Sequence, residues 1–161
     1  MVYRIATQID ISQIINVKNR VKQRVIDENL PIWQNGYPLD EFIIEDIENQ
    51  YGRVVEIDGT IVAYAVFLPS VIEYEDYLPN LENKHSFGRV MVDNNYTGKG
   101  IGRFLIQNMI NEAKILNNSG MIITADECNI KATNLYKSFG FKKIGEKQFP
   151  YAYLTIYELI F

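Results

Sequence analysis

The chain has 161 residues, of which 47% are hydrophobic and 22% are charged, proportions typical of a globular protein and not of a disordered or membrane-embedded one. This length predicts a single domain over residues 1–161 with a hydrophobic core of its own. The formal net charge of −4 argues against a nucleic-acid-binding surface, which would need clustered Lys and Arg, and it favours a cationic partner.

No segment predicts a membrane span or export. The longest apolar run, residues 61–68, is much shorter than the roughly 20 residues that cross a bilayer. No signal-peptide pattern precedes the first predicted strand. The single cysteine, Cys128, cannot form an internal disulfide, which fits a reducing compartment. We therefore expect a cytoplasmic protein that does not bind membranes.

The first half of the chain predicts one strand, two helices and a hairpin. The expected elements are a strand over residues 2–7, helices over 10–25 and 39–49, and strands over 53–57 and 60–68. The Asp58-Gly59 pair favours a type I′ turn, so the last two strands should be antiparallel neighbours. The basic residues of the first helix are expected to form a solvated face: Lys18, Arg20, Lys22 and Arg24.

Two loops in this half carry aromatic or acidic side chains. The only tryptophan, Trp33, lies in a loop over residues 29–38, where it either fills the core or lines a binding pocket. Residues 71–83 include Glu73 and Tyr77, which would suit the wall of an amine-binding pocket. A plain solvated connection is the alternative for this second loop.

A glycine-rich turn separates a strand over residues 89–93 from an amphipathic helix that begins inside the glycines. Gly98, Gly100 and Gly102 would each destabilise a helix interior by about 1 kcal/mol relative to Ala, so another requirement must keep them there. Without a Cβ, such residues take positive φ and present backbone N–H groups to an anion at the positive end of the helix dipole. The turn predicts a phosphate site, with close packing of helix on strand as the alternative.

Known phosphate-binding templates narrow this assignment. The Walker A pattern requires Ser or Thr directly after its Lys, and neither follows Lys99. In the dinucleotide fingerprint the third glycine would fall on Arg103, although Asp126 after the next strand mimics the acid that binds ribose. A nucleotide-binding protein therefore stays an alternative.

The second half predicts a strand, helix, strand unit followed by closing strands. The expected elements after the glycine-rich helix are a strand over residues 121–125, a helix over 129–139, and strands over 141–145 and 153–161. The two strands that flank the glycine-rich helix should be parallel, with a right-handed crossover. This arrangement puts the glycine turn at their carboxyl ends, where open α/β sheets bind ligands.

Two motifs lie on either side of the strand over residues 121–125. The first is Thr97-x-x-Gly100-x-Gly102, and the second, over residues 129–141, reads Asn-x-x-Ala-x-x-x-Tyr-x-x-x-Gly-Phe. The pair resembles the two signatures of the GNAT superfamily of acyl-CoA-dependent N-acetyltransferases. The second signature matches at every fixed position, whereas the first has Thr97 where the family usually has Arg or Gln.

The resemblance implies an α/β (α+β) fold with a mixed, mostly antiparallel sheet of about seven strands, about four helices on both faces, and a splayed parallel central pair. It implies acetyl-CoA as the acyl donor and no metal. The residues that it assigns to acetyl-CoA are Val90, Met91, Val92, Gly98, Lys99, Gly100, Ile101, Gly102, Arg103, Asn129 and Tyr136.

The resemblance also implies direct transfer of the acetyl group to a primary amine in a ternary complex. An amine with a pKa near 10.4 needs a base at pH 7, and the departing thiolate benefits from an acid. By resemblance, Tyr136 is the catalytic acid, and the backbone N–H of Val92 stabilises the oxyanion.

The base and the acceptor pocket are assigned by position alone. The candidates for the base are Glu73, Glu75, Asp76 and His85. We expect Glu73 to act as the catalytic base through a water, and Trp33, Tyr77 and Glu73 to bind the acceptor, a small-molecule or peptide amine that is cationic. A homodimer is compatible with this reading. The alternative function is a non-catalytic acyl-CoA-binding or nucleotide-binding regulatory module.

Overall fold

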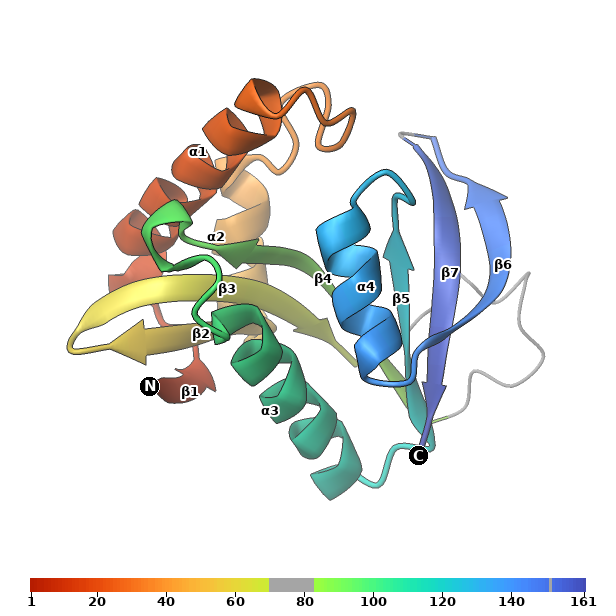
Figure 1. Ribbon diagram of the computed structural model, residues 1–161. Helices are drawn as coiled ribbons and strands as arrows, with labels where there is room; N and C mark the ends of the chain where they lie inside the picture. The colour runs from red at the N-terminus through yellow and green to blue at the C-terminus, as the bar shows by residue number, and fades with distance from the viewer. Residues whose placement is uncertain (70–82, 151) are drawn as a thin grey trace. The chain divides into compact units, whose positions relative to one another are not determined.

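The computed structural model describes residues 1–69, 83–150 and 152–161 of the chain (Figure 1). Its helical elements are η1 (Gln8–Asp10), α1 (Ile11–Asp27), α2 (Asp40–Glu48), η3 (Asn94–Tyr96), α3 (Ile101–Ile115) and α4 (Ile130–Ser138). Its strands are β1 (Val2–Ile5), β2 (Gly52–Ile57), β3 (Thr60–Leu68), β4 (Lys84–Val92), β5 (Gly120–Ala125), β6 (Lys142–Gln148) and β7 (Tyr153–Ile160). None of the helices within these ranges is long and apolar enough to cross a membrane.

The strands form a seven-stranded sheet in the order β1-β2-β3-β4-β5-β7-β6. The pairs β1–β2, β2–β3, β5–β7 and β6–β7 are antiparallel, and β4–β5 is parallel. The parallel ladder joins only residues 84–86 to residues 120–122, although both strands continue beyond it. The predicted mixed, mostly antiparallel sheet with a central parallel pair is confirmed.

The chain divides into two compact units, each made of two stretches of sequence. Unit 1 comprises Met1–Phe67 and Arg89–Asn108, and unit 2 comprises Leu68–Gly88 and Met109–Phe161. The division falls within β4 and within α3, so each of these two elements contributes residues to both units.

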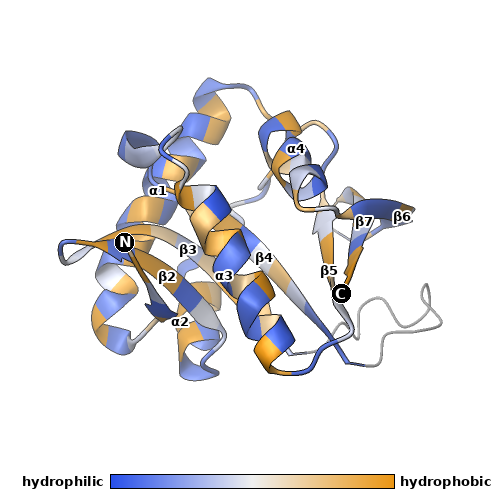
Figure 2. Ribbon diagram, turned by 60° about the horizontal axis from the view of Figure 1, so that its bottom comes forward, coloured by the Kyte–Doolittle hydropathy of each residue, from blue (hydrophilic) through white to orange (hydrophobic). Residues whose placement is uncertain are grey.

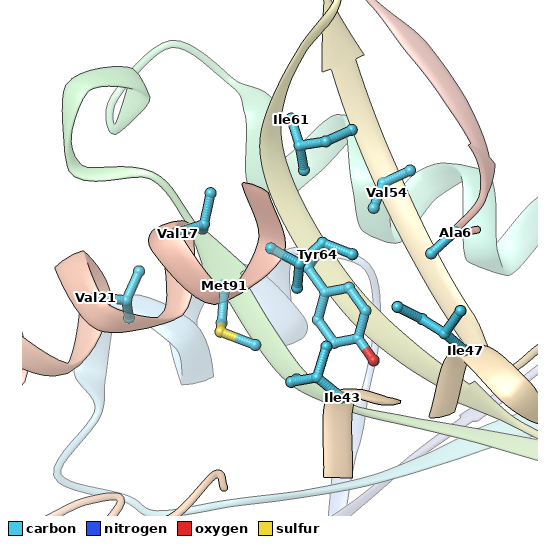
Figure 3. Close-up of a cluster of buried hydrophobic side chains, with 10 residues drawn as sticks. Ala6, Val17, Val21, Ile43, Ile47, Val54, Ile61, Tyr64 and Met91 are labelled. Carbon is cyan, nitrogen blue, oxygen red and sulfur yellow. The ribbon is translucent and has the colours of Figure 1, made fainter. Parts of the chain in front are cut away.

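Unit 1 is built on the hairpin of β2 and β3. Asp58 and Gly59 have φ angles of 49° and 77°, the positive values that a type I′ turn requires. Tyr64 of β3 is completely buried and lies at the centre of an apolar cluster (Figure 3). The other buried members come from β2, β3, β4, α1 and α2 and from the residue that follows β1: Ala6, Ile14, Val17, Val21, Ile43, Ile47, Val54, Ile61 and Met91.

Unit 2 is built on the long antiparallel pair of β5 and β7. Six residue pairs join these strands, and β6 pairs with the other edge of β7. Ile122, Phe149 and Ile156 form a buried cluster against which Leu154 packs. In Figure 2 the helices carry both hydrophobic and hydrophilic residues, in keeping with the amphipathic spacing that predicted them.

Two strands extend three or more residues beyond the boundaries expected from the sequence, while the other strand ends differ by at most two residues. β4 begins at Lys84 and not at residue 89. The hydrophobic pattern missed its first residues because Lys84 and Ser86 are polar and nevertheless buried. The Lys84 ammonium lies 2.5 Å from the Glu158 carboxylate of β7, and Lys84 is only 7% exposed. β6 likewise extends to Gln148, beyond its expected end at residue 145. A strand whose buried residues are charged does not show in a hydrophobic pattern.

Candidate functional site

The glycine turn of unit 1 connects β4 to α3. Gly98 and Gly100 have φ angles of 75° and 79°, in the region that residues with a Cβ rarely adopt. Gly102 lies within the first turn of α3 and is not among the glycines with positive φ. The expectation that the turn needs glycine for its backbone conformation therefore holds at two of the three positions.

The surroundings of these glycines argue against close packing as the reason for them. No described atom lies within 4 Å of a Cβ built on Gly98 or Gly100, and both residues are exposed. The first N–H groups of a helix have no partner inside the helix, and α3 is long enough to carry a helix dipole. The turn thus combines open space, flexible backbone and unpaired donors, which is what an anionic ligand needs.

The base of the turn is tied to α1 and β3. The Arg20 Nε donates to Asp93 Oδ2 at 3.1 Å, and a second Arg20 nitrogen contacts the same carboxylate. Asn94 Nδ2 donates to the Arg20 carbonyl at 2.9 Å, and the Asp93 N–H donates to the Val62 carbonyl at 2.9 Å. Asp93 is only 2% exposed, so its charge is held beneath the turn by one arginine.

This arrangement corrects the expectation of a solvated basic face on α1. Lys18 is buried and pairs with Asp40, Arg20 pairs with Asp93, and Lys22 Nζ donates to the Gly36 carbonyl at 2.6 Å. Spacing along the helix could not show it, since the partners lie on other elements.

Other side chains of the turn fold back onto it. Lys99 Nζ donates to the Asn95 carbonyl at 3.0 Å and lies 5.0 Å from the centre of the Tyr96 ring. The Thr97 hydroxyl, at the position where the family usually has Arg or Gln, donates to the Asn94 carbonyl at 3.0 Å. Thr97 therefore shapes the turn. Ile101 is buried and Arg103 is exposed.

The end of β4 presents alternating faces. Met91 points into the apolar cluster of unit 1, while Val90 and Val92 are half-buried. Asp93 directly follows β4, and its N–H donates to the Val62 carbonyl of β3. Since adjacent residues of extended backbone direct their N–H groups to opposite sides, we infer that the N–H of Val92 points away from β3.

Tyr136 of unit 2 combines a packed ring with a hydroxyl that no described residue binds. Its ring meets Phe87 and Phe141 edge to face, with centroids 5.7 Å and 6.3 Å away, and the residue is 5% exposed. The described residues offer its hydroxyl no hydrogen bond. Burial raises the pKa of Tyr136, so the hydroxyl keeps its proton at neutral pH.

The start of α4 is capped by side chains. Asn129 Oδ1 accepts a hydrogen bond from the Ala132 N–H at 3.3 Å, so one end of this amide has a structural task. Asp126 Oδ1 accepts from the Cys128 N–H at 2.9 Å, a turn contact that accounts for its place after β5 without a ribose. Burial and the neighbouring Asp126 raise the pKa of Cys128 to about 11, so its thiol is protonated.

The structure describes two of the remaining candidates, Trp33 and His85. Trp33 packs against the apolar cluster of unit 1, which favours the core-filling alternative over the pocket wall. His85 of unit 2 lies at the start of β4, where its Nδ1 is 2.6 Å from Asn118 Oδ1. Glu73, Glu75, Asp76 and Tyr77 lie outside the described residues. The part of the chain that the structure describes contains no group of three or more His, Cys, Asp or Glu that could hold a metal ion.

Comparison of the sequence with known proteins finds an acetyltransferase family model and two relatives whose names describe N-acetylation. A family model described as the acetyltransferase (GNAT) family matches residues 21–141. The chain is 29% identical over 158 residues to an N-alpha-acetyltransferase of Sulfurisphaera tokodaii, which covers 93% of this chain and 86% of that protein. It is 31% identical over 67 residues to an N-acetylaspartate synthetase of Danio rerio, a match that covers 42% of this chain and spans only 24% of that longer protein.

Solved structures share the fold. A GNAT-family acetyltransferase of Streptococcus agalactiae 2603 superposes with a TM-score of 0.88 at 22% identity, covering 99% of this chain and 94% of that one. A GNAT-family acetyltransferase of Brucella melitensis in complex with acetyl-CoA has a TM-score of 0.69 at 19% identity, covering 99% and 87%.

Proposed function

The chain belongs to the acetyltransferase (GNAT) family, with acetyl-CoA as its donor substrate, and we propose that it transfers the acetyl group directly to a primary amine in a ternary complex. The observation that carries this proposal is the exposed turn before α3, where Gly98 and Gly100 adopt positive φ with no described atom near the place of a Cβ.

In this proposal the turn binds the pyrophosphate of acetyl-CoA. The donors are the backbone N–H groups of residues 98–103, and Lys99 adds positive charge from its place over Tyr96. Val90, Met91 and Val92 contact acetyl-CoA through their backbone. The Met91 side chain is not available to the ligand, because it is buried in the core. Asn129 contributes its amide nitrogen to the pantetheine arm, because its oxygen caps α4.

Two groups of the chain act on the reacting atoms. The Val92 N–H, directed away from β3, donates to the carbonyl oxygen that gains negative charge as the amine attacks. Tyr136 donates its proton to the departing thiolate. No described residue binds this hydroxyl, so it is available to donate to a ligand, and this supports the role.

The acceptor amine must lose a proton before or during attack. We assign this step to Glu73, acting through a water, with Tyr77 beside the acceptor. Trp33 packs against the apolar cluster of unit 1 and could contact the acceptor only through the part of its half-buried side chain that this packing leaves open. Support for these assignments comes from sequence position and from the acidic, aromatic composition of residues 71–83. Glu73→Gln should lower kcat/KM for the amine, with Glu75→Gln as the neighbouring control, and equal effects of the two variants would contradict the assignment.

The acceptor is assigned as a cationic amine, either a small molecule or a peptide. The net charge of −4 supports a cation, and the names of the two relatives, an N-alpha-acetyltransferase and an N-acetylaspartate synthetase, suggest α-amines for the first trials. We also propose that residues 1–161 fold as one domain, because β4 and α3 each run through both units. The proposed location is the cytoplasm, supported by the single cysteine in the sequence. Light scattering will test for a homodimer.

The direct test measures release of the CoA thiol with a panel of peptide N-termini, amino acids, polyamines and aminoglycosides. Titration calorimetry with acetyl-CoA and with NAD runs in parallel. The proposal predicts acetyl-CoA binding and amine-dependent thiol release, with mass spectrometry showing acetylated amine. Binding of acetyl-CoA without transfer to any amine would favour a regulatory binding module, and preference for NAD would favour a dinucleotide site.

A further inference from the structure

Arg89 of unit 1 stands in an unusual backbone conformation for a strand residue. It has φ of 48° in the middle of β4, where ordinary strand residues have negative φ. A positive φ is the backbone conformation of one kind of β-bulge, which redirects the following residues, and we interpret the conformation of Arg89 in this way. The neighbouring Gly88 could have taken this conformation without steric penalty, yet the chain places an arginine there.

The Arg89 side chain accounts for this choice. Its Nε donates to Asp46 Oδ2 at 2.9 Å and a terminal nitrogen donates to Asp46 Oδ1 at 2.5 Å, the paired geometry that arginine makes with a carboxylate. Its other terminal nitrogen lies 3.3 Å from the Tyr37 hydroxyl. The Tyr64 hydroxyl also donates to Asp46 Oδ2, at 2.7 Å. Asp46 is 5% exposed, so the pair is shielded from water.

The bulge directly precedes the backbone that the proposed function uses. Beyond Arg89, the segment is held by the Met91 side chain in the apolar cluster and by the Asp93 N–H bond to Val62. The other end of this segment is fixed by Arg89, whose side chain pairs with Asp46 of α2. Between these fixed points lie Val90 and Val92, and the direction of the Val92 N–H depends on both ends.

We propose that Arg89 is a positioning residue for acetyl transfer: its paired bond to Asp46 holds the β4 bulge so that the Val92 N–H is aimed at the developing oxyanion. This inference rests on the proposed function. It differs from a role in stability because a displacement of about 1 Å at a catalytic group can lower the rate by about 10² while binding is unchanged.

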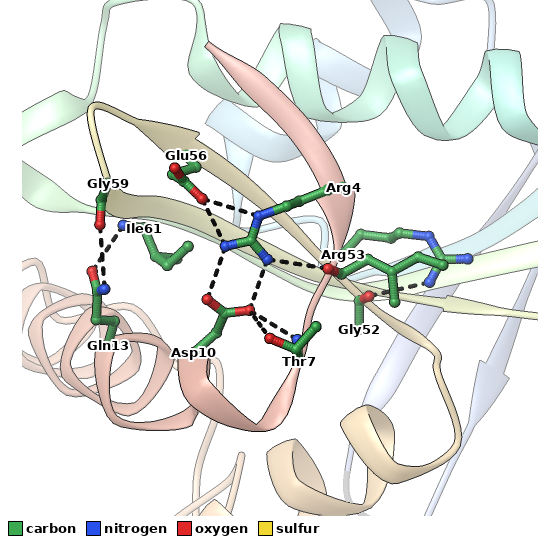
Figure 4. A network of polar contacts seen from close by, with 10 residues as sticks. Arg4, Thr7, Asp10, Gln13, Gly52, Arg53, Glu56, Gly59 and Ile61 are labelled. Carbon is green, nitrogen blue, oxygen red and sulfur yellow. Dashed lines mark hydrogen bonds and ion pairs between the residues drawn. The ribbon is translucent and has the colours of Figure 1, made fainter.

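The chain offers a matched control in Arg4 of β1. Arg4 makes the same type of paired contact with Asp10, at 2.8 Å and 2.9 Å, and also contacts Glu56 (Figure 4). Asp10 is 3% exposed, as shielded as Asp46. The two arginines therefore lose comparable bonds on replacement by lysine, but only Arg89 belongs to β4.

The experiment compares Arg89→Lys, Arg89→Gly, Asp46→Asn and Arg4→Lys by steady-state kinetics and by hydrogen exchange of the Val90–Val92 amides. Lysine keeps the charge and loses the paired geometry, whereas glycine relieves the backbone conformation and removes the bond. We expect the Arg89 and Asp46 variants to lower kcat by about 10- to 100-fold with KM for acetyl-CoA within threefold, and to speed amide exchange at Val90–Val92. Arg4→Lys should lower the melting temperature and change neither readout.

A folded Arg89→Gly protein with kcat within threefold of wild type, or with unchanged amide exchange, would overturn the inference. If Arg89→Gly does not fold, Arg89→Lys and Asp46→Asn decide in the same way below their melting temperatures. Faster exchange in a protein whose wild type transfers no acetyl group would refute the proposed function and leave the structural hold of Arg89 on β4 established.

Discussion

The two motifs that identify the family are built by opposite means. In unit 1 the glycine turn is exposed backbone, with open space around Gly98 and Gly100 and its polar anchors below it at Asp93. In unit 2 the Tyr136 ring packs edge to face against Phe87 and Phe141, which also contact each other, and it offers one hydroxyl. The first motif can therefore be blocked by adding atoms without touching a core, and the second can be silenced by removing one atom without changing its packing.

Of the changes considered, Tyr136→Phe should lower the catalytic rate most, and it should leave the binding of acetyl-CoA unaffected. Loss of a positioned proton donor should lower kcat by about 10² to 10⁴, with acetyl-CoA affinity nearly unchanged. Because no described residue binds the hydroxyl, the melting temperature should be retained or slightly higher. Steady-state kinetics and a thermal melt check this. A rate within threefold of wild type would reject the acid role, unless a pre-steady-state burst shows that acetyl transfer does not limit turnover.

Gly100→Val should show the reverse pattern, with a loss of binding. A β-branched residue at φ of 79° is strained and fills the space where the pyrophosphate would lie, so the Kd for acetyl-CoA should rise by about 10² or more. Gly102→Ala is the control, because Gly102 lies in the helix and Ala favours helix. Calorimetry in which both variants bind like wild type would show that the turn does not contact the ligand.

Arg20→Ala should weaken binding more modestly. It leaves the buried Asp93 carboxylate without its arginine and loosens the turn, so we expect the Kd for acetyl-CoA to rise about tenfold, with kcat at saturation preserved. Arg24→Ala removes the same charge one turn further along α1 and serves as the control. Equal effects of the two variants would mean that the charge matters to the ligand and that the tether does not.

The last prediction is that kcat of the wild-type protein does not change as the pH rises into the alkaline range. Burial raises the pKa of Tyr136 above its ordinary value of about 10, so its acid form persists as pH passes through 10. The proton-donating step should therefore show no decline in kcat between pH 8 and about 10. A fall with an apparent pKa near 10 that is absent from Tyr136→Phe would show that the hydroxyl titrates as if exposed.

Local signals in the sequence were sufficient for much of the fold and part of the site. The Asp58-Gly59 turn, the positive φ of Gly98 and Gly100, and the helix that follows Asn129 all arise from residues that are close in sequence. Contacts between residues that are far apart along the chain left no local signal in the sequence. Lys84 is buried against Glu158, 74 positions away.

The features that sequence reasoning missed share this cause. Arg20 finds Asp93 across 73 positions, and Arg89 finds Asp46 across 43, so each arginine is recognisable as an anchor only once the fold brings its partner to it. The bulge at Arg89 has no local signature beyond the preceding glycine. Periodicity describes which face of an element is apolar, and it says nothing of which charge will be buried there.

The most direct test of the account compares two ligands on the wild-type protein by calorimetry. Acetyl-CoA carries the pyrophosphate and S-acetylpantetheine lacks it, while both carry the thioester and the pantetheine arm. If the glycine turn binds the pyrophosphate, acetyl-CoA should bind at least about 10²-fold more tightly, and Gly100→Val should remove most of that difference. Equal affinity of the wild type for the two ligands would contradict the central claim.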